Sequence, residues 1–269
     1  MKPAPFAYAR PADWPAALAL LGSGARPVAG GQSIGPMLNL RMAQPGLVAD
    51  LRHLPEFGGI AVQGGTCRIG AGTTHAAIED GAVPGRLGAI LAGVARRIAY
   101  RPVRNRGTIG GSLAHADPAA DWVAVLPAFP GHAVALGPAG ERRIPLAGFV
   151  TGIFETALRP EEVLRAIELP LLPPETRWGH WKFCRKPGEF SKATACLLAI
   201  PGQAPRAVLA ALDGPPLPIP DATALLAAPE AEADRLLATL PGLEPWRAAL
   251  ARTALRRAAG MAAAGMPTA

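Results

Sequence analysis

Apolar side chains recur every three or four residues in several stretches of the chain, which is the spacing of one helical face. This pattern predicts a helix over 14–21, with Asp13 as its N-cap, and a longer helix over 87–98. Thr74 is the predicted N-cap of a short helix that ends near Glu79. The first hundred residues therefore contain helices of different length, separated by segments of another kind.

Other stretches alternate apolar and polar residues, or stay apolar for a few positions, as strands do. Strands are predicted at 48–52, 67–71, 163–169, 181–185, 193–200 and 207–212, and further helices at 118–129 and 243–261. The sequence GPAG predicts a hairpin around Gly137 to Gly140. Because helices and strands follow one another without a regular βα alternation, the predicted fold class is α+β.

Composition favours a folded chain, since 50% of the 269 residues are apolar although Gly (31) and Pro (30) are frequent. No run of ~18 apolar residues predicts a membrane span, and the N-terminal MKPAPFAYARPADW lacks the apolar core of a signal peptide. Three scattered cysteines, without a C-x-x-C pair, argue against a zinc ribbon or an iron–sulfur cluster held by this chain alone. We therefore expect a chain of the reducing cytoplasm.

The formal net charge of +7 could attract nucleic acid, an acidic partner or a phosphate-containing cofactor. No run of about five to eight lysines or arginines supports nucleic-acid binding. Four arginines of the predicted last helix are interpreted as a solvated face near a helix C-terminus, where cations are favoured: Arg247, Arg252, Arg256 and Arg257.

Two glycine pairs stand out, Gly30-Gly31 and Gly110-Gly111, and each is followed by a hydroxyl residue, Ser33 or Ser112. Glycines among small residues let main-chain amides approach an anion, and successive amides can form an anion-binding nest. Two such turns in one chain predict a diphosphate held between them. Neither turn reads G-x-G-x-x-G within a βαβ unit, so a Rossmann site is disfavoured.

Two carboxylates, Asp117 and Asp121, follow the second pair and suit the hydroxyls of a sugar or ribityl chain. The arginines before it, Arg104 and Arg106, either pair with phosphate or fix the loop through its carbonyls. His115 is interpreted as structural or as lying beside a cofactor. The histidines lack metal-ligand spacing, and no serine lies in a G-x-S-x-G elbow, so neither a metal site nor a hydrolase is predicted.

Four segments carry a resemblance to a known family: AGGQSIGPMLNLRMAQPGLVADL, VRNRGTIGGSLAHADPAADW, GFVTGIFETALRPEEVLRAIELP and FCRKPGEFSKATACLLAI. Together they resemble the FAD-binding medium subunit of molybdenum hydroxylases, the xanthine dehydrogenase and carbon monoxide dehydrogenase family. The resemblance implies a two-lobed FAD-binding domain of the vanillyl-alcohol-oxidase/PCMH type over 1–172, with lobes of about 1–56 and 57–172. A small α+β C-terminal domain over 177–269 would follow, with 171–175 as linker.

The resemblance also implies a set of FAD contacts. The diphosphate would be held by two runs of five residues, and three further residues match family contacts to FAD: Ala29, Gly30, Gly31, Gln32, Ser33, Thr108, Ile109, Gly110, Gly111, Ser112, Asp121, Leu164 and Lys182. No residue of this chain is expected to act as an acid or base on the organic substrate, and none to bind a metal.

The implied function is that of an electron-transfer subunit. A large molybdopterin-binding subunit would oxidise the substrate, a small subunit with two 2Fe-2S clusters would relay the electrons, and FAD on this chain would pass them to an external acceptor. The three chains would form a heterotrimer or a dimer of heterotrimers, without nucleic acid. Two alternatives stay open: a self-sufficient flavin oxidoreductase of the same fold, and a basic scaffold or nucleic-acid-binding module without cofactor.

Overall fold

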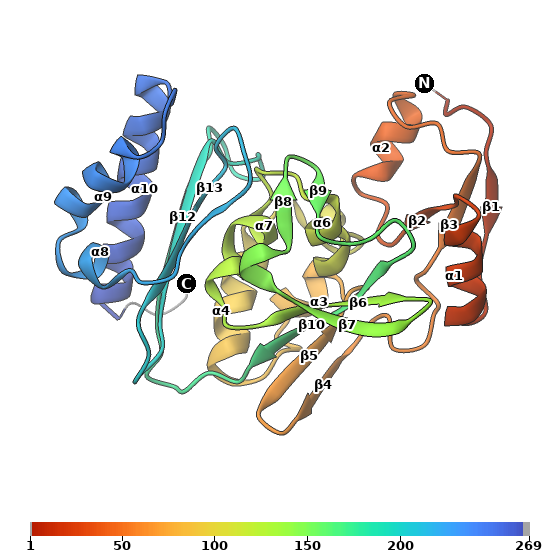
Figure 1. Ribbon diagram of the computed structural model, residues 1–269, viewed down its shortest axis with the longest axis horizontal. Coiled ribbons are helices and arrows are strands. Elements are labelled where there is room, and N and C mark those ends of the chain that lie inside the picture. Colours follow the sequence, from red (N-terminus) through yellow and green to blue (C-terminus); the bar gives the residue numbers. More distant parts are fainter. Residues whose placement is uncertain (1, 266–269) are drawn as a thin grey trace.

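The computed structural model describes residues 2–265, which form three units side by side along the long axis (Figure 1). The N-terminal unit is a three-stranded parallel sheet in the order β1-β3-β2 with two helices. Its elements are β1 (Ala7–Ala9), α1 (Trp14–Gly22), β2 (Arg26–Val28), α2 (Ile34–Asn39) and β3 (Leu47–Asp50). The Asp13 carboxylate accepts from the Ala16 amide, so the predicted cap of α1 is confirmed.

The central unit is built on a five-stranded antiparallel sheet in the order β4-β5-β10-β6-β7. Its strands are β4 (Ile60–Gln63), β5 (Thr66–Gly70), β6 (His132–Gly137), β7 (Gly140–Pro145) and β10 (Val163–Pro170). The predicted strands in this region and the hairpin around Gly137 to Gly140 are confirmed. A small hairpin, β8 (Val150–Gly152) with β9 (Glu155–Thr156), follows the short 3₁₀ helix η2 (Leu146–Gly148).

Helices gather on one side of this sheet (Figure 1). They are α3 (His75–Glu79), α4 (Gly85–Arg96), α5 (Arg101–Arg104), α6 (Ile109–His115), α7 (Asp121–Val125) and the 3₁₀ helix η1 (Leu126–Ala128). The Thr74 hydroxyl accepts from the Ala77 amide, as predicted for the cap of α3. The prediction of one continuous helix over 118–129 was wrong. The helix begins at Asp121 and changes to 3₁₀ geometry at Leu126, because Pro127 has no amide hydrogen to donate within an α-helix.

The C-terminal unit is a four-stranded antiparallel sheet in the order β11-β12-β13-β14, covered on one side by three helices. Its elements are β11 (Arg177–Phe183), β12 (Ala193–Ala199), β13 (Arg206–Ala210), β14 (Leu217–Ile219), α8 (Thr223–Ala227), α9 (Pro229–Ala238) and α10 (Pro245–Ala263). The predicted strand at 181–185 thus begins earlier, at Arg177. The overall arrangement is α+β, as the pattern predicted.

Both faces of this last sheet are buried. Along β12, Ala195 and Leu197 pack towards α10, whereas Cys196 and Leu198 belong to the core of the central unit. Helix α10 lies so close to β11 that a Cβ at Gly179 would stand 1.8 Å from the Ala258 carbonyl oxygen. The alanine-rich sequence of α10 permits this approach, because small side chains let the helix main chain come near the sheet.

The arginines of α10 lie at the surface, with Arg252 and Arg256 43% and 45% exposed, and they also have partners there. Arg247 pairs with Asp213, Arg252 with Asp234, and Arg256 with Glu230, while the Arg257 guanidinium lies 4.3 Å from the centre of the Trp181 ring. Two of the carboxylates come from α9 and the third from the loop after β13, so these arginines connect α10 to its neighbours. Within residues 2–265, no helix is long and apolar enough to cross a membrane.

Candidate functional site

A cavity of about 530 Å³ lies where the three units meet. Its walls come from the turn between β2 and α2, from the start of α6, from the segment that enters β10, and from the loop after β11. Cavities of this size hold small molecules and cofactors in proteins. The walls are segments far apart in sequence, so the cavity exists only in the folded chain.

The first glycine pair forms one wall and touches the segment that leads into the second. A Cβ on Gly30 would stand 1.9 Å from the Arg106 carbonyl oxygen, and a Cβ on Gly111 would stand 3.6 Å from the Ala29 Cβ. Only glycine fits at position 30, because the neighbour there is main chain and cannot yield. The two predicted turns are therefore packed side by side on one cavity, as the sequence predicted.

The main-chain amides of Gly30 to Ile34 donate to no carbonyl or side chain in the part of the chain that the structure describes. The turn is opened by Gly31, which has a φ of +74°. Gly30 is buried, Gly31 and Ile34 are half-buried, and Gln32 and Ser33 are exposed. A row of free amides that a ligand can reach along a cavity wall is suited to an acceptor-rich ligand. The first glycine pair thus has the free amides that the predicted anion-binding turn requires.

The second glycine pair differs from the prediction of an open nest. Thr108 caps α6 and its hydroxyl accepts from the Gly111 amide at 3.0 Å, while the Gly110 amide donates to the Ala71 carbonyl at 2.9 Å. The amides of Ile109 and Ser112 are also paired within the protein. This segment begins a helix, and helix-initiating amides are consumed by capping and by the neighbouring strand. What it presents at the cavity is therefore the hydroxyl groups of Thr108 and Ser112.

Asp121 and Lys182 form an ion pair at the cavity, with Lys182 Nζ 2.9 Å from Asp121 Oδ1. Lys182 also donates to Asp121 Oδ2 at 3.0 Å and to the Arg97 carbonyl at 2.7 Å. Burial raises the pKa of Asp121, and the charge of Lys182 opposes that rise. Oδ1 is fully buried and has only the Lys182 ammonium beside it, so the ion pair holds this oxygen away from the open part of the cavity.

Most of the predicted cofactor residues line this one cavity, namely Ala29, Gly30, Gly31, Gln32, Ser33, Thr108, Gly110, Gly111, Ser112, Asp121 and Leu164. Two do not. Ile109, the first residue of α6, is fully buried in the core. Lys182 lies behind Asp121 and acts on the cavity through that carboxylate. Asp117 is also absent from the lining: its Oδ1 accepts from the Ala119 amide and closes a local turn.

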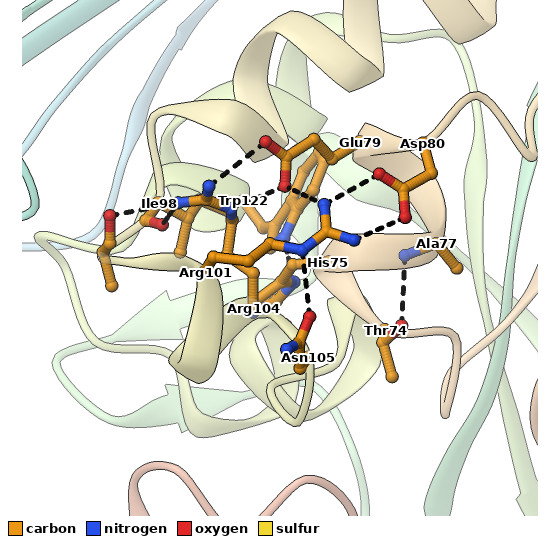
Figure 2. Close-up of polar contacts among 11 residues, drawn as sticks. Thr74, His75, Ala77, Glu79, Asp80, Ile98, Arg101, Arg104, Asn105 and Trp122 are labelled. Atoms are coloured by element: carbon orange, nitrogen blue, oxygen red, sulfur yellow. Dashed lines mark hydrogen bonds and ion pairs between the residues drawn. The ribbon is translucent and has the colours of Figure 1, made fainter.

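The sequence left open whether Arg104 binds phosphate or supports the loop, and its contacts favour loop support. Its guanidinium donates to Glu79 and to the carbonyls of Ile98 and Ala99, and Figure 2 shows it enclosed by these partners. Arg101 lies above it and bridges Glu79 and Asp80. Arg104 therefore fixes the segment of Ile98 and Ala99, which lines the cavity, to helix α3.

His75 is a cavity residue that the sequence did not indicate. It is the first residue of α3 and is 5% exposed, and its Nδ1 accepts from the Trp122 indole at 3.0 Å (Figure 2). Burial, with a smaller contribution from the Arg104 charge, lowers the pKa of His75 to about 4. His115 also lines the cavity, as interpreted from the sequence, and its ring centre lies 5.0 Å from that of Phe154.

The loop after β11 is a second part of the site without a clear sequence signal. Gly188, Glu189 and Phe190 line the cavity, and Phe190 is 64% exposed. The Tyr100 hydroxyl donates to the Pro187 carbonyl at 2.8 Å and ties this loop to the central unit. Residues 2–265 contain no group of three or more His, Cys, Asp or Glu side chains that could hold a metal ion.

Comparison with known proteins decides the family. Residues 4–172 match the family model described as FAD binding domain in molybdopterin dehydrogenase. The chain belongs to this family. The carbon monoxide dehydrogenase medium chain of Hydrogenophaga pseudoflava is 41% identical over 72% of this chain and 68% of that protein. A subunit of the 6-hydroxypseudooxynicotine dehydrogenase complex of Paenarthrobacter nicotinovorans is 36% identical over 80% of this chain and 74% of its own.

Solved structures agree over nearly the whole fold. A chain of carbon monoxide dehydrogenase from Hydrogenophaga pseudoflava superposes with a TM-score of 0.89 at 34% identity, covering 98% of this chain and 99% of that chain. A chain of quinoline 2-oxidoreductase from Pseudomonas putida 86 gives a TM-score of 0.87 at 28% identity, covering 98% and 99%. The protein is thus an FAD-binding subunit of the molybdenum hydroxylase class.

Proposed function

We propose that this chain carries FAD as the electron-transfer subunit of a molybdenum hydroxylase complex. It would receive electrons from 2Fe-2S clusters on a small partner subunit and deliver them to an external acceptor. A large partner subunit with molybdopterin would oxidise the organic substrate. The observation that carries the proposal is the single cavity on which two glycine segments and a buried carboxylate meet.

The proposed contacts follow from the donors and acceptors of the cavity. The free amides of Gly30 to Ile34 would bind the diphosphate oxygens, assisted by the hydroxyls of Thr108 and Ser112. The Asp121 carboxylate would accept from a hydroxyl of the cofactor, and Leu164 would pack against the cofactor. Lys182 would hold the Asp121 carboxylate in place.

When bound, FAD supplies the redox chemistry of this subunit. The chain's own residues bind it, orient it and exclude water from it. The Asp121–Lys182 pair keeps one charge of each sign beside the cavity, with side chains only 9% and 3% exposed. Since an ion pair in a low-dielectric setting acts more strongly than one in water, this pair would influence the potential of the bound cofactor.

The partner assignment is supported by the names of the relatives, which are medium chains or subunits of dehydrogenases that act on carbon monoxide, nicotine derivatives or caffeine. A heterotrimer or a dimer of heterotrimers is the proposed assembly. We propose the cytoplasm as its location, in keeping with the free thiols of Cys67, Cys184 and Cys196.

A glycine substitution tests the cofactor site. In Gly30→Ala the new Cβ would collide with the Arg106 carbonyl and displace the free amides. Hydrogen bonds to charged groups contribute about 1.5–3 kcal/mol, so FAD should bind at least about ten-fold more weakly. Gly35→Ala is the matched control, because nothing lies within 4 Å of its new Cβ. FAD affinity is measured by fluorescence titration of the full chain, and equal affinity of both variants would contradict the site.

A second experiment tests electron transfer. The full chain, loaded with FAD under anaerobic conditions, should keep its flavin absorbance when carbon monoxide, nicotine or caffeine is added. The same chain assembled with its partner subunits should be bleached by the substrate of that complex. Bleaching of the isolated chain would favour the alternative of a self-sufficient flavin oxidoreductase.

A further inference from the structure

The hydrogen bond between Trp122 and His75 fixes which ring nitrogen of His75 carries the proton. The Trp122 indole can only donate, and it donates to His75 Nδ1 at 3.0 Å. Nδ1 must therefore present a lone pair. In the neutral ring the proton then lies on Nε2, which makes Nε2–H a hydrogen-bond donor.

The opposite side of the ring faces the cavity. A Cβ on Gly107 would stand 2.8 Å from both Cδ2 and Nε2 of His75, so bare main chain is the neighbour there. His75 and Gly107 both line the cavity, and Gly107 in turn touches Gly30, whose Cβ would lie 2.8 Å from the Gly107 Cα. His75 Nε2 thus lies next to the wall that carries the free amides.

Nε2–H donates to no acceptor among residues 2–265. Although His75 is only 5% exposed, Nε2 is not among the fully buried polar atoms that lack a partner, so this nitrogen keeps access to the cavity that His75 lines. A ligand acceptor in the cavity can therefore reach it. The main chain that carries the ring is also fixed: the His75 amide donates to the Gly107 carbonyl at 2.9 Å, and Thr74 caps helix α3. The orientation of the donor is therefore set by the fold before any ligand arrives.

We infer that His75 is a further cofactor-binding residue, whose Nε2–H donates a hydrogen bond to an acceptor atom of FAD in this cavity. Trp122 is a positioning residue that selects the donor tautomer. Gly107 is the residue that leaves space between the imidazole and the cofactor. The inference rests on the proposed function, since it needs FAD in the cavity.

Nuclear magnetic resonance of the full chain with ¹⁵N-labelled histidine tests this directly. On addition of FAD, the Nε2-bound proton of His75 should shift downfield and exchange more slowly with water, whereas Nδ1 keeps the shift of an acceptor. FAD binding is followed in the same sample by flavin fluorescence. If FAD binds and the Nε2–H signal does not move, the inference fails while the proposed function stands. If the wild-type chain binds no FAD, both fail.

Variants supply the energetic test. His75→Phe keeps a planar ring without a donor and should weaken FAD binding about ten-fold, by the loss of one hydrogen bond. His75→Gln can accept from Trp122 and donate to the cofactor, so it should restore most of the affinity. Trp122→Phe removes the same internal hydrogen bond but leaves the imidazole, and should lose less FAD affinity than His75→Phe. Equal FAD affinity of wild type and a folded His75→Phe would overturn the inference.

Discussion

At the scale of single residues, the Asp121–Lys182 pair connects the cavity to the C-terminal unit. The carboxylate is the first residue of α7 and the ammonium comes from β11. A paired charge in the interior is tolerated because each ion compensates the other, and removal of one partner leaves the other buried alone. The pair therefore couples cofactor binding to the stability of the fold.

Lys182→Met should destabilise the chain by about 3–5 kcal/mol at neutral pH, since it leaves a buried carboxylate without its cation. Burial raises the pKa of Asp121, so the folded chain binds the proton more readily than the unfolded chain and gains stability as pH falls. The difference in free energy of unfolding between wild type and Lys182→Met, measured by urea unfolding, should thus decrease from pH 7 to pH 5. A deficit that grows over this interval would contradict the assignment, and Asp121→Asn with Lys182→Met should restore most of the stability.

At the scale of elements, helices α3 and α5 are joined by arginines of unequal burial. Arg104 and Glu79 are 11% and 12% exposed, whereas Arg101 is 45% exposed. The buried pair also holds the carbonyls of Ile98 and Ala99. Because water screens exposed ion pairs, Arg101 should contribute less to the stability of the fold than Arg104, although both contact Glu79.

We predict that Arg104→Gln lowers the free energy of unfolding by about 3 kcal/mol, whereas Arg101→Gln has a much smaller effect on it. The pKa of Glu79 is lowered, first by its hydrogen bond to Arg104. A carboxylate with a lowered pKa stabilises the fold above its ordinary pKa and loses this effect as pH falls. The difference between wild type and Arg104→Gln in urea unfolding should therefore decrease below about pH 4, and similar losses in both variants would refute the distinction.

At the scale of the whole molecule, the sheet of the C-terminal unit has a core on each side. Cys196 and Leu198 pack into the central unit, where the Cys196 thiol lies 3.7 Å from the Ala124 carbonyl. The division into domains 1–172 and 177–269 stays a prediction, and this packing indicates that the two parts depend on each other.

The fragment 1–172 should accordingly expose apolar surface that β12 covers in the full chain, around the fully buried α7. We expect it to aggregate, or to melt at a markedly lower temperature than the full chain, because the lost burial contributes about 25 cal/mol per Å² of apolar area. Differential scanning calorimetry and light scattering check this. A monomeric fragment that melts cooperatively at the full-chain temperature would show that the first part folds independently.

Several features of this protein were set by local sequence alone. Asp13 and Thr74 define helix starts, the alternation around 67–71 defines a central strand, and GPAG defines a hairpin, because capping and turn formation involve residues close in the chain. The two glycine pairs also mark the segments that we propose to bind the cofactor, since only glycine permits such close main-chain contact.

Tertiary structure decided the rest, because the deciding contacts join residues remote in sequence. The amides at Gly110 and Gly111 were consumed by the strand end at Ala71 and by the cap at Thr108, whereas those of Gly30 to Ile34 stayed free. The tautomer of His75 depends on Trp122, and the charge of Asp121 depends on Lys182. Local sequence thus determined which segments could bind a diphosphate, and long-range packing decided which of their groups remained available to it.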